Sequence, residues 1–282
     1  MDWLHLTVDE SVFVREWARV GPMSFLFRAQ WPAAGRDGRP DSRMVCQSHR
    51  QAALFIAHAV FGVPRTHETL LGDLTVRVNP EHALPTGEPL PLDLEIVCRE
   101  GGRGGRVLTG LHAETTIRHD GVVIAVIATE FSWVSPAVYR RLRGGRGRFD
   151  ADDVPPLTPV PAASVGRADP AEVTLAQADG PGRFLLRCDF ADTGLFDHPT
   201  DHVPGLVLAE AAEQAAYAVT GGRLVPDELS HTFLNYVEFD EPCLIEAAEV
   251  PSGRPGVTAV EVTARQGDEV TFRSVLSGSV AP

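Results

Sequence analysis

The chain has 282 residues, 44% of them hydrophobic, and carries a formal net charge of -13. This length suits two domains of ordinary size, each able to bury its own core. The negative charge argues against a nucleic-acid partner, and because no apolar run reaches transmembrane length we expect no membrane association.

The four cysteines, Cys46, Cys98, Cys188 and Cys243, are isolated and show no Cys-x-x-Cys spacing. This pattern indicates neither a zinc site nor a disulfide framework. The N-terminal sequence MDWLHLTVDESVFV lacks a basic segment followed by a long apolar core, so it does not resemble a secretory signal. We therefore expect a cytoplasmic protein with no bound metal and no cofactor.

The first half of the chain predicts a strand, a buried helix and then several strands. The alternating segment SFLFRAQW from Ser24 reads as the strand, and an apolar helix follows at 44–61. Later strands are expected at 70–78, 88–97, 112–118 and 122–134.

Two unusual segments separate this half from the next. The basic run YRRLRGGRGR at 139–148 has no aromatic residues interleaved between its arginines, and it reads as a solvated helix end and loop. Proline and glycine then concentrate in a stretch typical of an extended linker. We place a first repeat at 1–145, this linker at 146–181 and a second repeat at 182–282.

The second half repeats the order of the first. The segment RFLLRCDF from Arg183 predicts a strand, and an apolar helix is expected at 205–221. Glu210 and Gln214 of that helix lie 163 positions after Gln47 and Gln51 of the first helix. Later strands are expected at 232–239, 243–250, 257–264 and 269–280.

The segment LFDHPTDHVPGLVLAEAAEQAA at 195–216 is where we expect the chemistry. Pro204 fixes a turn before the helix, which leaves the first N–H groups, those of Gly205 and Leu206, without helical partners. Such groups suit a carbonyl oxygen that gains negative charge during a reaction. We therefore expect Gly205 and Leu206 to bind a substrate carbonyl.

One face of this helix is polar although the remainder is small and apolar. Glu210, Glu213, Gln214 and Tyr217 fall on that face at helical spacing. A buried glutamate without a function would be costly unless it is paired. We expect Glu210 and Glu213 to act as a coupled acid and base, with Gln214 binding substrate.

His198 and His202 lie in the loop before the helix. Three roles remain open for them: metal binding, hydrogen bonds that hold the turn, or direct acid–base and substrate contact. We include both among the catalytic candidates.

The same segment resembles the A-factor biosynthesis (AfsA) hotdog family of gamma-butyrolactone synthases. Residues 196–199, 201–205 and 210–212 match the family's Phe-Asp-His-Pro, Asp-His-Val-Pro-Gly and Glu-Ala-Ala motifs in order, and residues 46–64 resemble its first-half helix. The fit to beta-hydroxyacyl-carrier-protein dehydratases is partial. The resemblance implies an α+β double hotdog, with two repeats that each wrap an antiparallel sheet around a central helix.

The sequence also departs from the family. The family usually has Arg where Glu213 stands and Glu where Gln47 stands, and Arg50 occupies the position of Glu213 in the first helix. The family reaction is understood to transfer a beta-ketoacyl group from a carrier protein to dihydroxyacetone phosphate, whose phosphate Glu213 would repel. We keep Gln47 and Arg50 as candidate substrate-binding residues, although the first repeat's site is degenerate.

The resemblance implies an enzyme of specialised metabolism that acts on a thioester of acyl carrier protein or coenzyme A. We expect acyl transfer to a small hydroxylated acceptor, with Glu210 as general base and a histidine orienting the acceptor. A dehydratase or thioesterase on the same scaffold is the first alternative. A non-catalytic binding or partner protein is the second, and the sequence leaves homodimerisation open.

Overall fold

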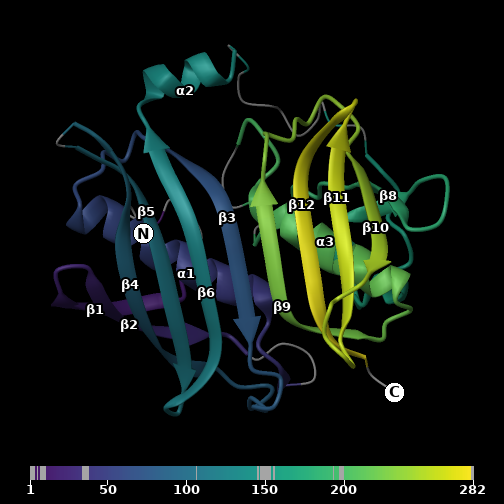
Figure 1. Ribbon diagram of the computed structural model, residues 1–282, viewed down its shortest axis with the longest axis horizontal. Helices are drawn as coiled ribbons and strands as arrows, with labels where there is room; N and C mark the ends of the chain where they lie inside the picture. The colour runs from purple at the N-terminus through teal and green to yellow at the C-terminus, as the bar shows by residue number, and fades with distance from the viewer. Residues whose placement is uncertain are drawn as a thin grey trace. The chain divides into compact units, whose positions relative to one another are not determined.

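The computed structural model describes residues 4, 6, 11–33, 38–105, 107–144, 146, 154, 156–192, 194–196 and 200–280. The chain divides into two compact units, Met1–Gly145 and Arg146–Pro282. In each unit one long helix lies against an antiparallel sheet (Figure 1).

The described part of the first unit contains six strands in the spatial order β1-β2-β4-β5-β6-β3. Its central helix is α1 (Ser42–Phe55), which continues as one short π-helical segment, η3 (Ile56–Val60). A short exposed helix, α2 (Pro136–Leu142), follows the last strand and carries the start of the basic run. The strands are β1 (Val14–Gly21), β2 (Ser24–Trp31), β3 (Glu68–Val78), β4 (Leu90–Gly104), β5 (Val107–His119) and β6 (Val122–Val134).

The second unit repeats this order as β7-β8-β10-β11-β12-β9 around the helix α3 (Gly205–Val219). Two 3-10 turns, η5 (Ala162–Val165) and η6 (Pro170–Glu172), precede its first strand. The strands are β7 (Leu175–Gln177), β8 (Arg183–Leu186), β9 (Leu224–Phe233), β10 (Leu244–Val250), β11 (Thr258–Gln266) and β12 (Glu269–Val280). The two predicted repeats are therefore both present, each with a central helix and an antiparallel sheet.

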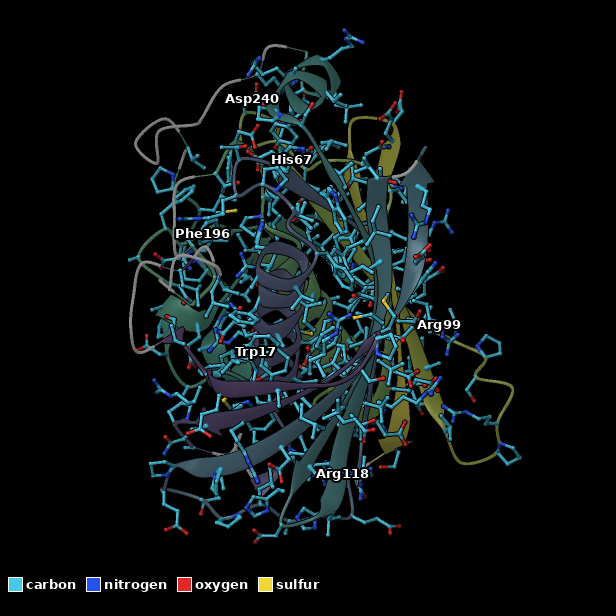
Figure 2. All side chains as sticks on the ribbon, turned by 90° about the vertical axis from the view of Figure 1, so that its left-hand side faces the viewer. Trp17, His67, Arg99, Arg118, Phe196 and Asp240 are labelled. Atoms are coloured by element: carbon cyan, nitrogen blue, oxygen red, sulfur yellow. The ribbon has the colours of Figure 1, made fainter. Side chains whose placement is uncertain are left out.

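Hydrophobic alternation explains how each sheet covers its helix. In β2, Phe25, Phe27, Ala29 and Trp31 are buried while the residues between them are exposed, as expected when one face of a strand packs on a core. Trp17 of the edge strand β1 packs against Phe27 and Phe55, with ring centroids 6.4 and 5.0 Å away (Figure 2). These aromatic contacts hold β1 and β2 against the end of α1.

The structure differs from the linker predicted at 146–181. Its later part forms η5, η6 and β7, and β7 pairs with β8 as β1 pairs with β2. Val165 and Val173 are fully buried. Proline and glycine mark the turns of this segment, but the apolar residues between those turns pack into the core, so the second repeat begins before residue 182.

The strand predicted at 232–239 is also wrong in its position, because β9 occupies Leu224–Phe233. This strand contains Pro226, and proline is unfavourable inside a sheet because it cannot donate a hydrogen bond to a neighbouring strand. The structure accommodates it at a bulge, where the register of β12 against β9 shifts between Ser277 and Gly278. A side chain at 278 would lie 1.9 Å from the carbonyl oxygen of Val225, so the bulge requires glycine.

Among the described residues, no helix combines the length and the apolar composition needed to cross a membrane.

Candidate functional site

The two central helices begin differently. Asp41 caps α1, and its carboxylate accepts hydrogen bonds from the N–H groups of Arg43 at 2.8 Å and Met44 at 3.3 Å. Pro204 stands before α3 and offers no such group, and no described side chain caps this helix. The first N–H groups of α3, on Gly205 and Leu206, are thus not occupied by a capping carboxylate as those of α1 are.

Glu210 lies on α3, one and a half turns from that N-terminus, and its side chain is only 6% exposed. Arg167 donates to its Oε1 atom from Nε at 2.8 Å, and Nη2 of Arg167 forms an ion pair with the same oxygen at 2.6 Å. Gln214 donates to the same oxygen from Nε2 at 2.6 Å. The predicted general base is therefore a buried carboxylate in an ion pair.

Arg167 was missed by the sequence analysis because it falls inside the predicted linker. Glu210 is paired with Arg167, whose guanidinium supplies the opposite charge that a buried carboxylate needs, and the coupling of Glu210 with Glu213 stays a prediction. Glu213 lies half-buried on the next turn of the helix. Its predicted catalytic role stays a prediction.

The side chain of Gln214 forms hydrogen bonds with other groups of the protein, although it was predicted to bind substrate. Its Oε1 accepts from the N–H of Thr174 at 3.0 Å, and its Nε2 donates to the carbonyl of Glu172 at 2.8 Å as well as to Glu210. The side chain is fully buried. Both N–H groups of the amide are therefore used within the protein, and Gln214 is better described as a residue that positions Glu210 than as a ligand-binding residue.

Gln47 and Arg50 lie half-buried on α1 of the first unit. They occupy the positions that correspond to Glu210 and Glu213 on α3. Their predicted role in substrate binding stays a prediction.

His202 lies in the loop before α3, where its ring contacts one acidic and one aromatic side chain. Its Nδ1 lies 2.7 Å from Oδ1 of Asp201, and its ring meets the edge of Tyr236 with centroids 4.7 Å apart. A proton on Nδ1 would leave Nε2 as the acceptor of the neutral ring. His198, the second predicted histidine, lies outside the described residues.

Other histidines and cysteines belong to the core. His49 of α1 is buried between Thr115 and Thr129, whose hydroxyl oxygens lie 2.7 and 2.8 Å from its two ring nitrogens. The described cysteines, those named above, are free thiols. Within the described ranges, no group of three or more His, Cys, Asp or Glu side chains could hold a metal ion.

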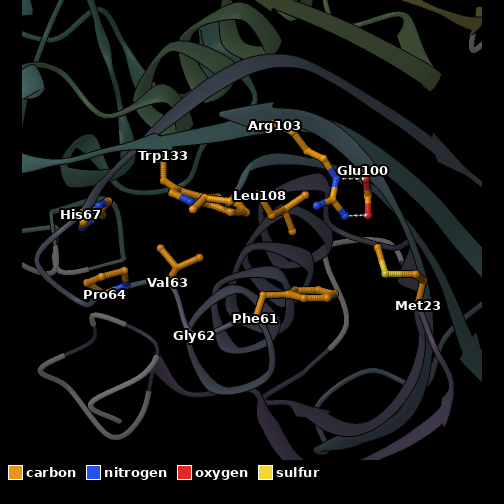
Figure 3. A pocket seen from close by; sticks show the side chains of 11 residues that line it. Met23, Phe61, Gly62, Val63, Pro64, His67, Glu100, Arg103, Leu108 and Trp133 are labelled. Atoms are coloured by element: carbon orange, nitrogen blue, oxygen red, sulfur yellow. Dashed lines mark hydrogen bonds and ion pairs between the residues drawn. The ribbon is translucent and has the colours of Figure 1, made fainter. Parts of the chain in front are cut away.

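A separate cavity of about 390 Å³ lies in the first unit beyond the end of η3 (Figure 3). Phe61, Val63 and Trp133 line it, and an ion pair between Glu100 and Arg103 stands at its edge. None of the predicted site residues lines this cavity, so it does not replace the start of α3 as the candidate site.

Comparison with known sequences agrees with two similar units that each contain a central helix, of which only the second carries a buried glutamate. The model of the A-factor biosynthesis hotdog domain matches residues 1–135 and again residues 150–282. The chain belongs to the A-factor biosynthesis hotdog family. The resemblance and the double-hotdog fold inferred from the motifs are thereby confirmed.

Two curated members of the A-factor biosynthesis family align over nearly the whole chain. A 2-oxo-3-(phosphooxy)propyl 3-oxoalkanoate synthase of Streptomyces virginiae is 38% identical, over 97% of this chain and 95% of its own length. A synthase of the same name from Streptomyces griseus is 36% identical, over 99% of this chain and 94% of its own.

Solved structures show the same fold at low sequence identity. A putative oleoyl thioesterase from Lactobacillus plantarum has a TM-score of 0.61 at 12% identity and covers 91% of this chain and 97% of its own. A 12:0-ACP thioesterase from Umbellularia californica has a TM-score of 0.55 at 10% identity, over 90% and 94%. At this identity the likeness shows the fold alone.

Proposed function

We propose that this protein is a cytoplasmic acyltransferase of specialised metabolism. It transfers an acyl group from a thioester of acyl carrier protein or coenzyme A to a small hydroxylated acceptor. The observation that carries the proposal is Glu210, a buried carboxylate held in an ion pair near a helix N-terminus that no described side chain caps.

The reaction follows from the chemistry of these groups. The N–H groups of Gly205 and Leu206 polarise the thioester carbonyl and stabilise the negative charge that forms on its oxygen. Glu210 takes the proton of the acceptor hydroxyl as a new bond forms between that oxygen and the acyl carbon. The carbon–sulfur bond then breaks, and the proton passes from Glu210 to the departing thiolate. His202 orients the acceptor.

The names of the relatives support an ester product. A 2-oxo-3-(phosphooxy)propyl 3-oxoalkanoate is an ester in which a 3-oxoacyl group is joined to a phosphorylated three-carbon alcohol. We propose a 3-oxoacyl thioester as the donor and a three-carbon alcohol as the acceptor. Such an ester would lead toward a butenolide or gamma-butyrolactone signal.

A second candidate is hydrolysis or dehydration on the same scaffold. Glu213 favours it, because a second carboxylate on the turn after Glu210 disfavours an anionic acceptor and leaves room for water or a neutral group. In that reaction Glu210 would activate water in place of the acceptor hydroxyl, or abstract a proton from the acyl chain.

Mass spectrometry of the intact carrier protein separates these reactions. The protein is incubated with a 3-oxoacyl and a 3-hydroxyacyl carrier-protein thioester, each with and without dihydroxyacetone or its phosphate. Deacylation that requires the acceptor supports acyl transfer, deacylation without acceptor indicates hydrolysis, and loss of water from the hydroxyacyl chain indicates dehydration. An unchanged mass of the carrier protein under all these conditions would indicate a non-catalytic binding protein.

Replacing Glu210 by Gln tests the role of the carboxylate. The change keeps the size of the side chain and removes its ability to accept a proton, so we expect turnover to fall by about 100-fold or more. Circular dichroism and the melting temperature serve as the control for folding. Turnover within a few fold of the parent would give Glu210 a structural role and refute the proposed mechanism.

A further inference from the structure

We propose that Arg167 is a positioning residue for this reaction, which turns one particular oxygen of Glu210 toward the acceptor. The inference rests on the proposed function, because it takes Glu210 as the group that accepts the proton. Arg167 and Gln214 occupy Oε1 of the carboxylate, and Oε2 is the atom that meets the acceptor hydroxyl.

The hydrogen bonds around Glu210 distinguish its two oxygens. Oε1 accepts one from Nε of Arg167 at 2.8 Å and one from Gln214 at 2.6 Å, and Nη2 of Arg167 forms an ion pair with the same oxygen at 2.6 Å. No described residue donates to Oε2. A carboxylate oxygen offers about two lone-pair directions, so the two hydrogen bonds and the ion pair occupy Oε1 and leave Oε2 to take up a proton.

The main chain before Arg167 is anchored to α3, which fixes the direction of the guanidinium. The turn η5 contacts α3, and the N–H of Arg167 donates to the carbonyl of Ala162 at 2.9 Å. Gly166 has φ +69°, and a Cβ there would lie 2.9 Å from the ring of Tyr217 on α3. Arg167 also donates from Nη1 to the carbonyl of Gly166 at 3.2 Å.

The residue of the first unit that corresponds to Arg167 can be identified from the spacing of the two repeats. β7 begins 161 positions after β1, and the backbone groups bonded to Gln214 lie 161 positions after those bonded to Gln51. At this separation Arg167 corresponds to Leu6. Buried apolar residues flank both positions at the same spacing: Leu4 and Val12 in the first unit, Val165 and Val173 in the second.

Both charges are therefore absent together from the first unit, where Leu6 replaces Arg167 and Gln47 replaces Glu210. That unit nevertheless builds the same sheet order, the same central helix and the same glutamine contact. The fold does not require the ion pair. The ion pair is present in the second unit, where no described side chain caps the N-terminus of α3. It is absent from the first unit, where Asp41 caps α1.

Steady-state kinetics of Arg167→Met and Arg167→Lys test the proposal. We expect Arg167→Met to lower kcat about 10-fold to 100-fold, with the KM for the thioester unchanged within about twofold, because the base is misdirected while the thioester site is intact. Arg167→Lys should lie between this variant and the parent, since an ammonium keeps the charge but cannot form the two-nitrogen contact. Millimolar guanidinium should partly restore Arg167→Met.

Two further variants serve as controls, the first for folding and the second for the loss of an arginine ion pair away from the site. Arg167→Leu combined with Glu210→Gln installs the first unit's side chains, and it should melt near the parent temperature but be inactive. Arg183→Gln removes an exposed ion pair with Glu246 and should leave kcat unchanged.

Several results would overturn the proposal. The first is a kcat of Arg167→Met within twofold of the parent while Glu210→Gln is inactive. The second is a rise in the KM of Arg167→Met with its kcat unchanged. If Arg167→Met does not fold, Arg167→Lys decides, and an unchanged kcat overturns the proposal. Activity in Glu210→Gln would instead refute the proposed function itself, so the two failures are distinguishable.

Discussion

Gln51 and Gln214 make the same pair of backbone hydrogen bonds in their two units. Gln51 donates to the carbonyl of Ser11 at 2.7 Å and accepts from the N–H of Phe13 at 2.8 Å. Gln214 donates to Glu172 and accepts from Thr174, which are likewise two residues apart. In each repeat one amide ties the central helix to the chain that enters the first strand, and among the contacts of the described residues only Gln214 also bonds a carboxylate.

We predict that Gln51→Met and Gln214→Met each lower the free energy of unfolding by about 2–4 kcal/mol. Methionine keeps the length of the side chain but leaves a backbone N–H and a carbonyl without their partner. Only Gln214→Met should also lower kcat, because Glu210 loses one of its donors. Denaturant unfolding and steady-state kinetics measure both effects, and an equal loss of kcat in Gln51→Met would contradict the difference drawn between the two amides.

Gly166→Ala should lower both stability and kcat. A φ of +69° costs an alanine about 1–2 kcal/mol, and the new methyl group would press on the ring of Tyr217, shifting the chain that carries Arg167. Gly62→Ala is the matched control, because Gly62 has the same φ and a Cβ added there would have no atom within 4 Å. Melting temperatures and kcat separate backbone strain from the clash. If both variants behave alike, the contact with Tyr217 does not position Arg167.

Glu213→Arg should increase the use of a phosphorylated acceptor. Exchanging a half-buried carboxylate for a guanidinium replaces repulsion with a charge-assisted hydrogen bond of about 2 kcal/mol, or roughly 30-fold in kcat/KM. Glu213→Gln should fall between the parent and this variant. The measurement compares kcat/KM for dihydroxyacetone and its phosphate. A parent that already prefers the phosphate would place the phosphate site away from Glu213.

Stability should fall as the pH is lowered from about 6.5 toward 4. Burial lowers the pKa of His49 from 6.5 to about 4, so between these values the unfolded chain binds a proton that the folded chain does not. His231 in the second unit is buried and shifted in the same direction, also to about 4. Each histidine contributes stability that is present above its unfolded pKa and falls by on the order of 3 kcal/mol across the window.

His49→Gln tests this pH dependence, because an amide can still bond Thr115 and Thr129 but does not titrate. In urea unfolding between pH 7.5 and 4.5, the free energy of unfolding should decrease less steeply with falling pH in the variant than in the parent. An unchanged slope would mean that His49 is protonated in the folded protein.

The sequence by itself determined the repeated architecture. Alternating apolar residues predict β2, β6 and β12 at their observed bounds, because a strand with one buried face must alternate whatever its partners are. The apolar composition around Glu210 likewise predicts a buried helix with one polar face, and α3 begins at the predicted Gly205. These features depend on residues close together in the chain.

Only the tertiary structure decided which charge faces Glu210. Arg167 lies 43 positions earlier, in a segment whose prolines and glycines indicate turns but do not indicate what those turns pack against. Burial of Val165 and Val173, together with the contact between Gly166 and Tyr217, brings that segment onto α3 and places the guanidinium at the carboxylate. The partner of a buried charge is set by packing between distant segments, and local sequence patterns do not encode that packing.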